Sequence, residues 1–294
     1  MNSSYPTSSP TLAFTAAAAD PASRLHWVGE QADAVEFSPD PNHLDRLAEM
    51  IRPFLAQHRF VRFHTRYFEH ELGHADPALA DLALEAHLRT LRAMVGLGEP
   101  VVTVHTGLDP NQPVQESRFV ENLARLVAHG KDLGIVVCLE NLRFGPSSEP
   151  ANVLRWAERA GAMITLDVGH ALGSEAARGG RCPAERFVDL FADRLFEVHI
   201  YGREDDQGHH PIEDIAPFRP LMAKLLQTEC VWWTIELQRP EHALATRALL
   251  LDELDPAVPP SHLNPREAEP HPVFPIRSRF AVPGQNRLCS PLNL

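Results

Sequence analysis

The sequence predicts a (β/α)8 barrel, the TIM-barrel architecture, over residues 1–254, followed by a Pro-rich C-terminal tail over residues 255–294. Eight short apolar runs alternate with eight longer amphipathic segments, and about 250 residues is a usual length for such an α/β barrel. The apolar runs are nearly continuous, as is typical of parallel strands buried on both faces. An open doubly wound sheet is the rival architecture. No Gly-x-Gly-x-x-Gly turn follows any run, so its dinucleotide-binding form is disfavoured and we expect no nucleotide cofactor.

The expected elements follow one another in a regular strand–helix order. The expected strands are Thr11–Thr15, Ala34–Phe37, Phe60–His64, Val101–His105, Ile135–Glu140, Met163–Asp167, Leu195–Ile200 and Val231–Leu237. The expected helices are Pro21–Gln31, His43–His58, Pro77–Val95, Glu116–Leu133, Pro150–Ala160, Pro183–Asp193, Ile215–Thr228 and Glu241–Leu254. Helix starts are marked by pairs such as Asp76-Pro77, because proline is favoured in the first turn. Gly134 and Gly161 mark two helix ends, where a left-handed residue is favoured.

The last part of the chain differs in composition from the barrel. Nine of the 39 residues from 256 to 294 are proline, and neither helical nor strand periodicity is present. We expect this tail to lie over the barrel or to remain mobile.

Composition excludes several classes of protein. The formal net charge of −12 disfavours nucleic acid as a partner, because non-specific binding needs clustered basic charge. No apolar stretch approaches the length of a membrane span, so we expect no membrane partner. The four cysteines lie far apart without a Cys-x-x-Cys pair and no basic leader precedes the N-terminal alanines, which favours a cytoplasmic location. Lys131 and Lys224 are the only lysines and both fall in expected helices, which argues against a Schiff-base lysine at a strand end.

Seven consecutive expected strands end on residue types that bind metals. The C-terminal strand ends of a (β/α)8 barrel meet at one mouth, where catalytic groups lie. Ser, Thr, Asn or Lys would terminate a strand equally well, so chance explains one such residue but not seven. Mixed carboxylate and imidazole ligands favour Zn²⁺, Mn²⁺, Co²⁺ or Fe²⁺ over Ca²⁺ and Mg²⁺. The residues are Glu36, His64, His105, Glu140, Asp167, His199 and Glu236.

The last four strands predict one divalent-metal site. Its expected ligands are Glu140, Asp167, His199 and Glu236. His64 and His105 lie on strands beside that of Glu140, and they would hold a second metal bridged by Glu140 or bind substrate. His170, three residues after Asp167, would bind substrate or ligate a further ion.

A separate motif, from His70 to His74, has the His-Glu-x-x-His pattern of zinc peptidases. That chemistry needs both histidines one turn apart on a stable helix. The segment Phe68–Ala75 is short, contains Gly73 and ends before Asp76-Pro77. We therefore expect a loop over the active site that contacts substrate, and not a peptidase helix.

The strand-end motifs together resemble those of the xylose isomerase-like barrel superfamily, the AP endonuclease family 2 group. This superfamily includes sugar isomerases, ketose 3-epimerases and endonuclease IV. The matching motifs are VRFHTRY, VVTVHTG, VCLEN, LDVGHA, EVHIYGRED and the closing IEL, in family order from Arg59 to Leu237. The resemblance implies a TIM barrel and an active site at its mouth, and it leaves the reaction open.

The epimerase branch of the superfamily implies one set of roles. Its four metal ligands match Glu140, Asp167, His199 and Glu236. Its substrate-binding histidine matches His170. An arginine commonly follows the seventh-strand histidine in this branch, which makes Arg203 a candidate for substrate binding.

The endonuclease IV branch implies further metal ligands. His64 and His105 match the ligands of an additional zinc. In that branch an Asp-x-His pair after the seventh strand completes a third zinc site with the residue at His170. His210 matches the histidine of that pair, but Gly208 stands where the aspartate would be, which disfavours a three-zinc mechanism.

We predict a divalent-metal-dependent isomerase or epimerase of a small sugar, sugar phosphate or related polyhydroxy carbonyl compound. Glu140 and Glu236 would exchange the substrate proton as base and acid, through an enediolate that the metal stabilises. One alternative is an endonuclease IV-like zinc phosphodiesterase, which explains His64 and His105 better but fits the −12 charge less well. A second alternative is a non-catalytic ligand-binding barrel. The expected partner is a small-molecule substrate, and a homo-oligomer is left open.

Overall fold

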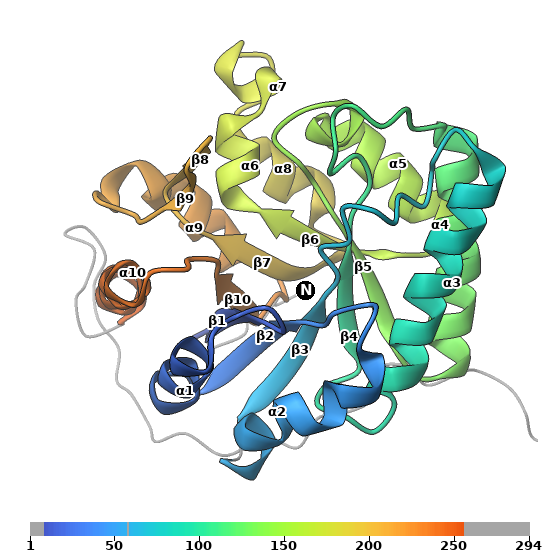
Figure 1. Cartoon of the computed structure of the whole chain (residues 1–294). Helices are drawn as coiled ribbons and strands as arrows, with labels where there is room; N and C mark the ends of the chain where they lie inside the picture. Colours follow the sequence, from blue (N-terminus) through green and yellow to red (C-terminus); the bar gives the residue numbers. More distant parts are fainter. Residues whose placement is uncertain (1–8, 58, 256–294) are drawn as a thin grey trace, which may run out of the picture. The chain divides into compact units, whose positions relative to one another are not determined.

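Eight parallel strands form a closed barrel in this computed structural model, which describes residues 9–57 and 59–255 (Figure 1). The order around the barrel is β1-β10-β7-β6-β5-β4-β3-β2. The strands are β1 (Thr11–Ala17), β2 (Ala34–Ser38), β3 (Phe60–His64), β4 (Val101–Val104), β5 (Val136–Glu140), β6 (Met163–Asp167), β7 (Leu195–Ile200) and β10 (Trp232–Ile235). The predicted TIM barrel is confirmed. The predicted tail, apart from Asp255, lies outside the described residues.

Helices surround the barrel on its outer side (Figure 1). The helices that cover it are α1 (Ala22–Gln31), α2 (Leu47–Ala56), α3 (Pro77–Met94), α4 (Glu116–Asp132), α5 (Pro150–Ala160), α8 (Ala184–Phe191), α9 (Arg219–Leu225) and α10 (Pro240–Leu254). Short 3-10 helices are η1 (Leu44–Arg46), η2 (Pro146–Ser148) and η3 (Ala216–Phe218). The predicted helices at 43–58 and 215–228 thus each consist of a 3-10 turn followed by a shorter α-helix.

Local sequence signals account for several helix ends. The Asp76 carboxylate accepts a hydrogen bond from the backbone N–H of Ala78 at 2.8 Å, with Pro77 in the first turn of α3. Gly134 and Gly161 have φ values of +74° and +77°, the left-handed conformation that closes a helix with least strain in glycine.

Three features after β6 and β7 were not predicted from the sequence. A short helix, α6 (Val168–Gly173), follows β6, and its first turn is capped by the Asp167 carboxylate, which accepts from the His170 N–H at 2.6 Å. The chain after β7 forms a small antiparallel hairpin of β8 (Arg203–Asp205) and β9 (Gly208–His210). A further one-turn helix, α7 (Glu175–Arg178), follows α6. These elements are too short to show a periodic apolar pattern.

Alternate strand residues face the helices and the barrel interior. The residues that face the helices are apolar and buried, as on β3, where Val61 and Phe63 are both fully buried. The interior residues are largely polar. Thr103 on β4 and Thr165 on β6 bond at 2.7 Å across the barrel. Polar and titratable side chains therefore fill positions of the interior that are usually occupied by branched aliphatic side chains in TIM barrels.

Arg62 on β3 occupies the barrel interior two residues before His64. Its guanidinium lies 2.9 Å from Glu99 and 3.7 Å from Glu197, and it lies over the ring of Trp232 at 4.2 Å from the ring centroid. Burial would lower the pKa of Arg62, but the two carboxylates outweigh that effect and raise it. This cation balances buried negative charge directly below the mouth.

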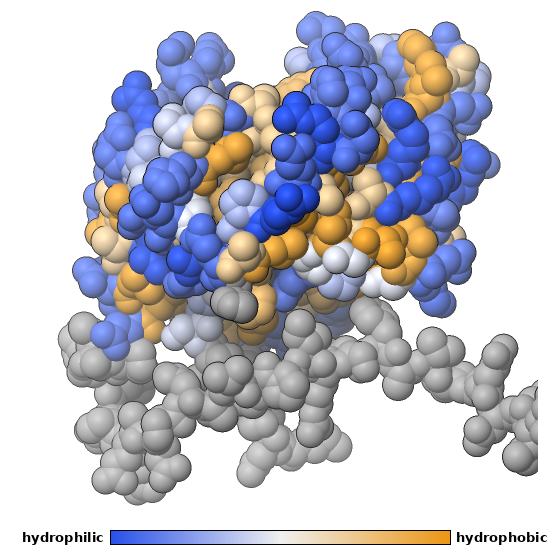
Figure 2. All heavy atoms as spheres, turned by 60° about the horizontal axis from the view of Figure 1, so that its bottom comes forward, coloured by the Kyte–Doolittle hydropathy of each residue, from blue (hydrophilic) through white to orange (hydrophobic). Residues whose placement is uncertain are grey.

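The outer surface is mixed in character. Figure 2 shows hydrophilic residues on both flanks of one face, with more hydrophobic residues between them. Within residues 9–57 and 59–255, the helices lack the combination of length and apolar character needed to cross a bilayer.

We expect Arg62→Met to lower the free energy of unfolding by about 3–5 kcal/mol, because Glu99 and Glu197 would lose the cation between them. The matched control is Arg155→Met, which removes an exposed pair with Glu116 worth at most about 1 kcal/mol. Urea unfolding of the metal-free proteins measures both losses. Equal losses in the two variants would show that Arg62 does not support the barrel interior.

Candidate metal centre

The seven predicted strand-end residues converge in one buried cluster at the barrel mouth. Each is at most 6% exposed, although all are titratable. The strands are parallel, so their C-terminal ends share one side of the barrel. The cluster contains Glu36 on β2, His64 on β3, His105 after β4, Glu140 on β5, Asp167 on β6, His199 on β7 and Glu236 after β10.

The first ligand group is the predicted four-residue set. Glu140, Asp167, His199 and Glu236 each offer one ligand atom, and these atoms all lie within 4.8 Å of one another. His199 Nδ1 lies 3.2 Å from Glu140 Oε2 and 3.8 Å from Glu236 Oε2. Asn141 positions Asp167, because its side-chain amide exchanges hydrogen bonds of 2.9 and 3.0 Å with the Asp167 backbone.

The second ligand group shares Glu140 with the first. His64 Nε2 and His105 Nε2 lie 3.2 Å apart, and their rings stack with centroids at 4.7 Å. Glu140 Oε2 is 3.2 Å from His64 Nε2 and 3.0 Å from His105 Nε2. A single carboxylate oxygen therefore faces the imidazoles of both groups, in the manner of a bridging ligand.

The third ligand group joins α6 to the β8–β9 hairpin. His170 Nε2 lies 3.4 Å from Glu204 Oε2, and His209 Nε2 lies 3.9 Å from Glu204 Oε1. The ring of Tyr201 stacks on His209 at a centroid distance of 3.8 Å and holds it in place. Burial would lower the pKa of His170, but Asp167 and then Glu204 raise it to about 10.

Glu204 and His209 were not among the residues predicted from the sequence, which were their neighbours Arg203 and His210. Glu204 pairs with His209 across the hairpin, so both side chains lie on one face. Arg203 and His210 form the adjacent pair on the other face, where both contact Asp205. The structure thus does not bring Arg203 or His210 into the cluster. Residues 205–208, which end in a glycine, are typical of a hairpin turn. A hairpin predicted there would have placed alternate side chains on opposite faces.

The His-Glu-x-x-His segment has a structural role in this fold. It forms turns and no helix, which agrees with the loop predicted there. The buried Glu71 carboxylate accepts from Gly73 N–H at 2.7 Å, from the Thr106 hydroxyl at 2.7 Å and from Gly107 N–H at 2.6 Å. Glu71 thereby ties the loop after β3 to the loop after β4, and it is not a peptidase base.

The unpaired atoms of the cluster fit a divalent cation. A buried polar atom without a partner is costly, and natural proteins rarely retain one without a reason. Within the described residues, the buried atoms of the seven-residue cluster that have no hydrogen-bond partner are Glu36 Oε2, His64 Nδ1, Glu140 Oε1 and Oε2, Asp167 Oδ2, His199 Nδ1 and Glu236 Oε1. Mixed imidazole and carboxylate donors of this kind suit Zn²⁺, Mn²⁺, Co²⁺ or Fe²⁺.

The charges in the cluster shift one another's protonation. Burial alone would lower the pKa of His64, but the carboxylates of Glu36 and Glu140 raise it to about 9. Burial lowers the pKa of His105 despite the neighbouring Glu140. Burial raises the pKa of Asp167 to about 6. Strongly shifted pKa values in a buried cluster of mixed charge are typical of a functional site.

The comparisons with known proteins agree with this fold. The chain is 29% identical over 158 residues to the uncharacterized protein MJ0008 of Methanocaldococcus jannaschii, which covers 54% of this chain and 68% of that protein. A D-tagatose 3-epimerase-like protein superposes with a TM-score of 0.65 at 21% identity, over 83% of this chain and 96% of that one. Endonuclease IV from Thermus thermophilus superposes with a TM-score of 0.60 at 15% identity, over 83% and 100% of the two chains.

Identities this low between structures show a shared fold and nothing more. The sequence match to a family model is broader, because it extends over residues 28–254 and so includes every residue of the three ligand groups. The chain therefore belongs to the xylose isomerase-like TIM-barrel family, AP endonuclease 2.

Proposed function

We propose that this protein is a divalent-metal-dependent isomerase or epimerase of a small polyhydroxy carbonyl compound, such as a sugar or sugar phosphate. The observation that carries the proposal is the placement of Glu140 and Glu236. They come from strands separated by β6 and β7, yet both face His199 Nδ1, and both retain unpaired carboxylate oxygens. The D-tagatose 3-epimerase-like neighbour supports ketoses as the first substrates to assay.

The ion would be held by Glu140, Asp167, His199 and Glu236. A bound divalent cation supplies Lewis-acid polarisation of a carbonyl and its neighbouring hydroxyl. Glu140 and Glu236 then lie where one carboxylate can remove a proton beside the carbonyl and the other can return it. Exchange of the proton between two carboxylates on different walls of the barrel accounts for inversion at carbon or for isomerisation.

The remaining residues would position the substrate. Arg66 Nη1 lies 3.5 Å from Glu236 Oε1, with its side chain 30% exposed at the mouth. His170 is held by the Asn141 carbonyl oxygen, which lies 2.9 Å from its Nδ1. His64 and His105 would bind substrate oxygens if they do not hold a second ion.

A second candidate function is a multinuclear phosphodiesterase related to endonuclease IV. Two observations favour it: Glu140 Oε2 bridges the first two ligand groups, and Glu204 supplies an acid to the third group. Gly208 stands where that branch has an aspartate, but Glu204 supplies a carboxylate to the same group. Bound divalent ions would supply charge stabilisation to a phosphoryl group. The net charge of −12 remains less favourable for a nucleic-acid substrate.

We expect chelator treatment to abolish activity and Mn²⁺, Co²⁺ or Zn²⁺ to restore it, because the four ligands hold the ion on which catalysis depends. Metal analysis of protein purified without chelator then counts ions per chain. One ion supports the isomerase, and two or three support the phosphodiesterase.

His199→Ala should lose the ion of the first group, whereas His64→Ala and His105→Ala should retain it. Full activity in metal-free protein would contradict metal dependence, and a chain that binds no metal would indicate a non-catalytic barrel.

We expect Glu236→Gln to slow epimerisation by about 10²–10⁴-fold while metal stays bound, because an amide cannot accept the proton. In heavy water the wild-type protein should place deuterium on the substrate carbon, and the variant should do so far more slowly. Mass spectrometry of the recovered substrate measures this exchange. Glu213→Gln, on the exposed surface after β9, is the control and should behave as wild type. Wild-type turnover in Glu236→Gln with metal in place cannot be reconciled with this role.

If the second group holds an ion, as the phosphodiesterase alternative requires, we expect binding of Zn²⁺ there to release protons at about pH 7.5. The pKa of His64 is raised to about 9, so below that pH the imidazole carries a proton that the metal must displace. Apparent affinity should therefore rise as pH increases from about 7 to about 9. Calorimetry in buffers of different ionisation enthalpy counts the protons. His64→Ala should release fewer, and equal release from both proteins would refute the assignment.

A further inference from the structure

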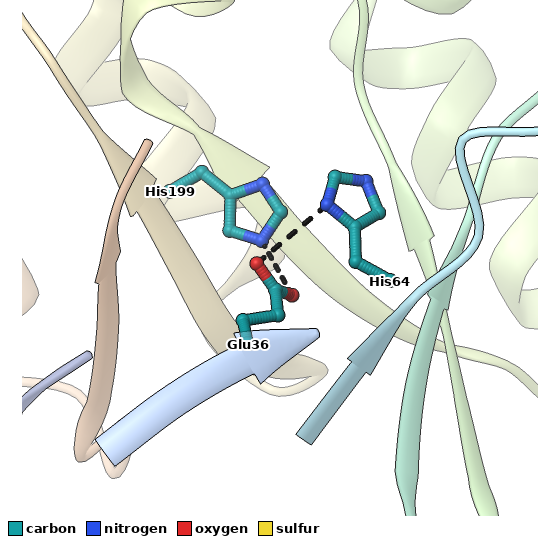
Figure 3. Close-up of side chains that lie close together, drawn as sticks. All are labelled: Glu36, His64 and His199. Atoms are coloured by element: carbon teal, nitrogen blue, oxygen red, sulfur yellow. Dashed lines mark hydrogen bonds and ion pairs between the residues drawn. The ribbon is translucent and has the colours of Figure 1, made fainter. Parts of the chain in front are cut away.

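Glu36 is the one strand-end residue of the cluster outside the three ligand groups described above, although one of its carboxylate oxygens also lies within 4.8 Å of ring nitrogens of His64 and His199. It lies on β2, is fully buried, and points its carboxylate between His199 and His64 (Figure 3). Glu36 Oε1 is 2.9 Å from His199 Nε2, and Glu36 Oε2 is 3.6 Å from His64 Nδ1. These contacts join β2 to β7 across the interior of the barrel and to the neighbouring strand β3.

Each of the two histidines faces Glu36 with one ring nitrogen and faces the proposed metal ligands with the other. His199 presents Nδ1 to Glu140 and Glu236, and it presents Nε2 to Glu36. His64 presents Nε2 to His105 and Glu140, and Nδ1 to Glu36. Glu36 therefore lies behind both rings, on the side away from the shared Glu140 carboxylate. This position is that of an outer partner and not of a fourth metal site.

A metal can bind an imidazole nitrogen only through a free lone pair, so the proton of a neutral ring must sit on the other nitrogen. A carboxylate that accepts this N–H fixes both the tautomer and the orientation of the ring. The 2.9 Å contact is short enough for such a hydrogen bond, whereas the 3.6 Å contact to His64 is an ion pair only. The effect should thus fall mainly on His199.

We propose that Glu36 is a positioning residue that holds the proton of His199 on Nε2 and thereby directs Nδ1 to the metal of the first ligand group. The same carboxylate orients His64 more weakly, which links the first group to the second. This inference rests on the proposed metal site. It adds to that site a residue that would touch neither metal nor substrate.

The test is Co²⁺ binding to the full chain after removal of metal, followed by visible absorption. Wild-type protein that binds no Co²⁺ would refute the proposed metal site itself. If wild type binds, Glu36→Gln should bind about 10- to 100-fold more weakly, because its amide can donate to Nε2 and so favours the wrong tautomer. An unchanged Co²⁺ affinity in Glu36→Gln would overturn the positioning role alone.

The matched control is Glu197→Gln. Glu197 is also a fully buried carboxylate, and it lies on β7 two residues from His199. It contacts Arg62 and Thr234 and makes no hydrogen bond or ion pair with His199 or His64 among the described residues. Its Co²⁺ affinity should stay within a few-fold of wild type. An equal loss in both variants would mean that replacing any buried carboxyl group has this effect, which would overturn the contact-specific role of Glu36.

A second measurement does not depend on Glu36→Gln or Glu197→Gln. Wild-type protein with ¹⁵N-labelled histidine and bound Zn²⁺ should show His199 with a protonated Nε2 and a metal-bound Nδ1, and the resonance is assigned by its loss in His199→Ala. The hydrogen bond to Glu36 should make this ring proton exchange slowly with water. Protonation on Nδ1 with metal on Nε2 would overturn the proposal directly.

Discussion

The pleat of the parallel strands is the constraint on which this site depends. Successive side chains of a strand face opposite sides, so residues two apart on β3 or β7 share the barrel interior. Arg62 and His64 follow this rule on β3, and Glu197 and His199 follow it on β7. Apolar residues between them pack against the helices. Closure of the sheet then places inward side chains from opposite walls within hydrogen-bonding distance, as between β2 and β7.

The ionisable groups in the barrel interior can be buried because groups of opposite charge lie next to one another. Burial alone disfavours every ionised group in the interior. Carboxylates and imidazoles offset one another at the mouth, and Arg62 offsets Glu99 and Glu197 below it. The arrangement still leaves ligand atoms of Glu140 and Asp167 unpaired. The buried charges therefore stabilise one another, yet several ligand atoms still lack a partner. This is what we expect of the proposed metal centre.

The hairpin after β7 distinguishes the two functions proposed for this barrel. Glu204 and His209 extend the cluster beyond the four residues that are proposed to hold the ion of an isomerase. Their position depends on the hairpin register and on the stacking of Tyr201 against His209. A site with one ion and a site with several therefore differ in a surface element, while the barrel strands stay the same. Fold alone does not identify the reaction in such a family.

Sequence alone determined the barrel, because eight apolar runs and eight amphipathic segments are signals local to each element. It also identified the inward strand-end residues, since a period of two and the shared mouth of parallel strands follow from backbone geometry. It could not separate His209 from His210, because a shift of one residue in a short hairpin reverses the face of each side chain. Nor could the sequence predict the hydrogen bond between Glu36 and His199, because these residues are 163 positions apart and meet only once the barrel has closed.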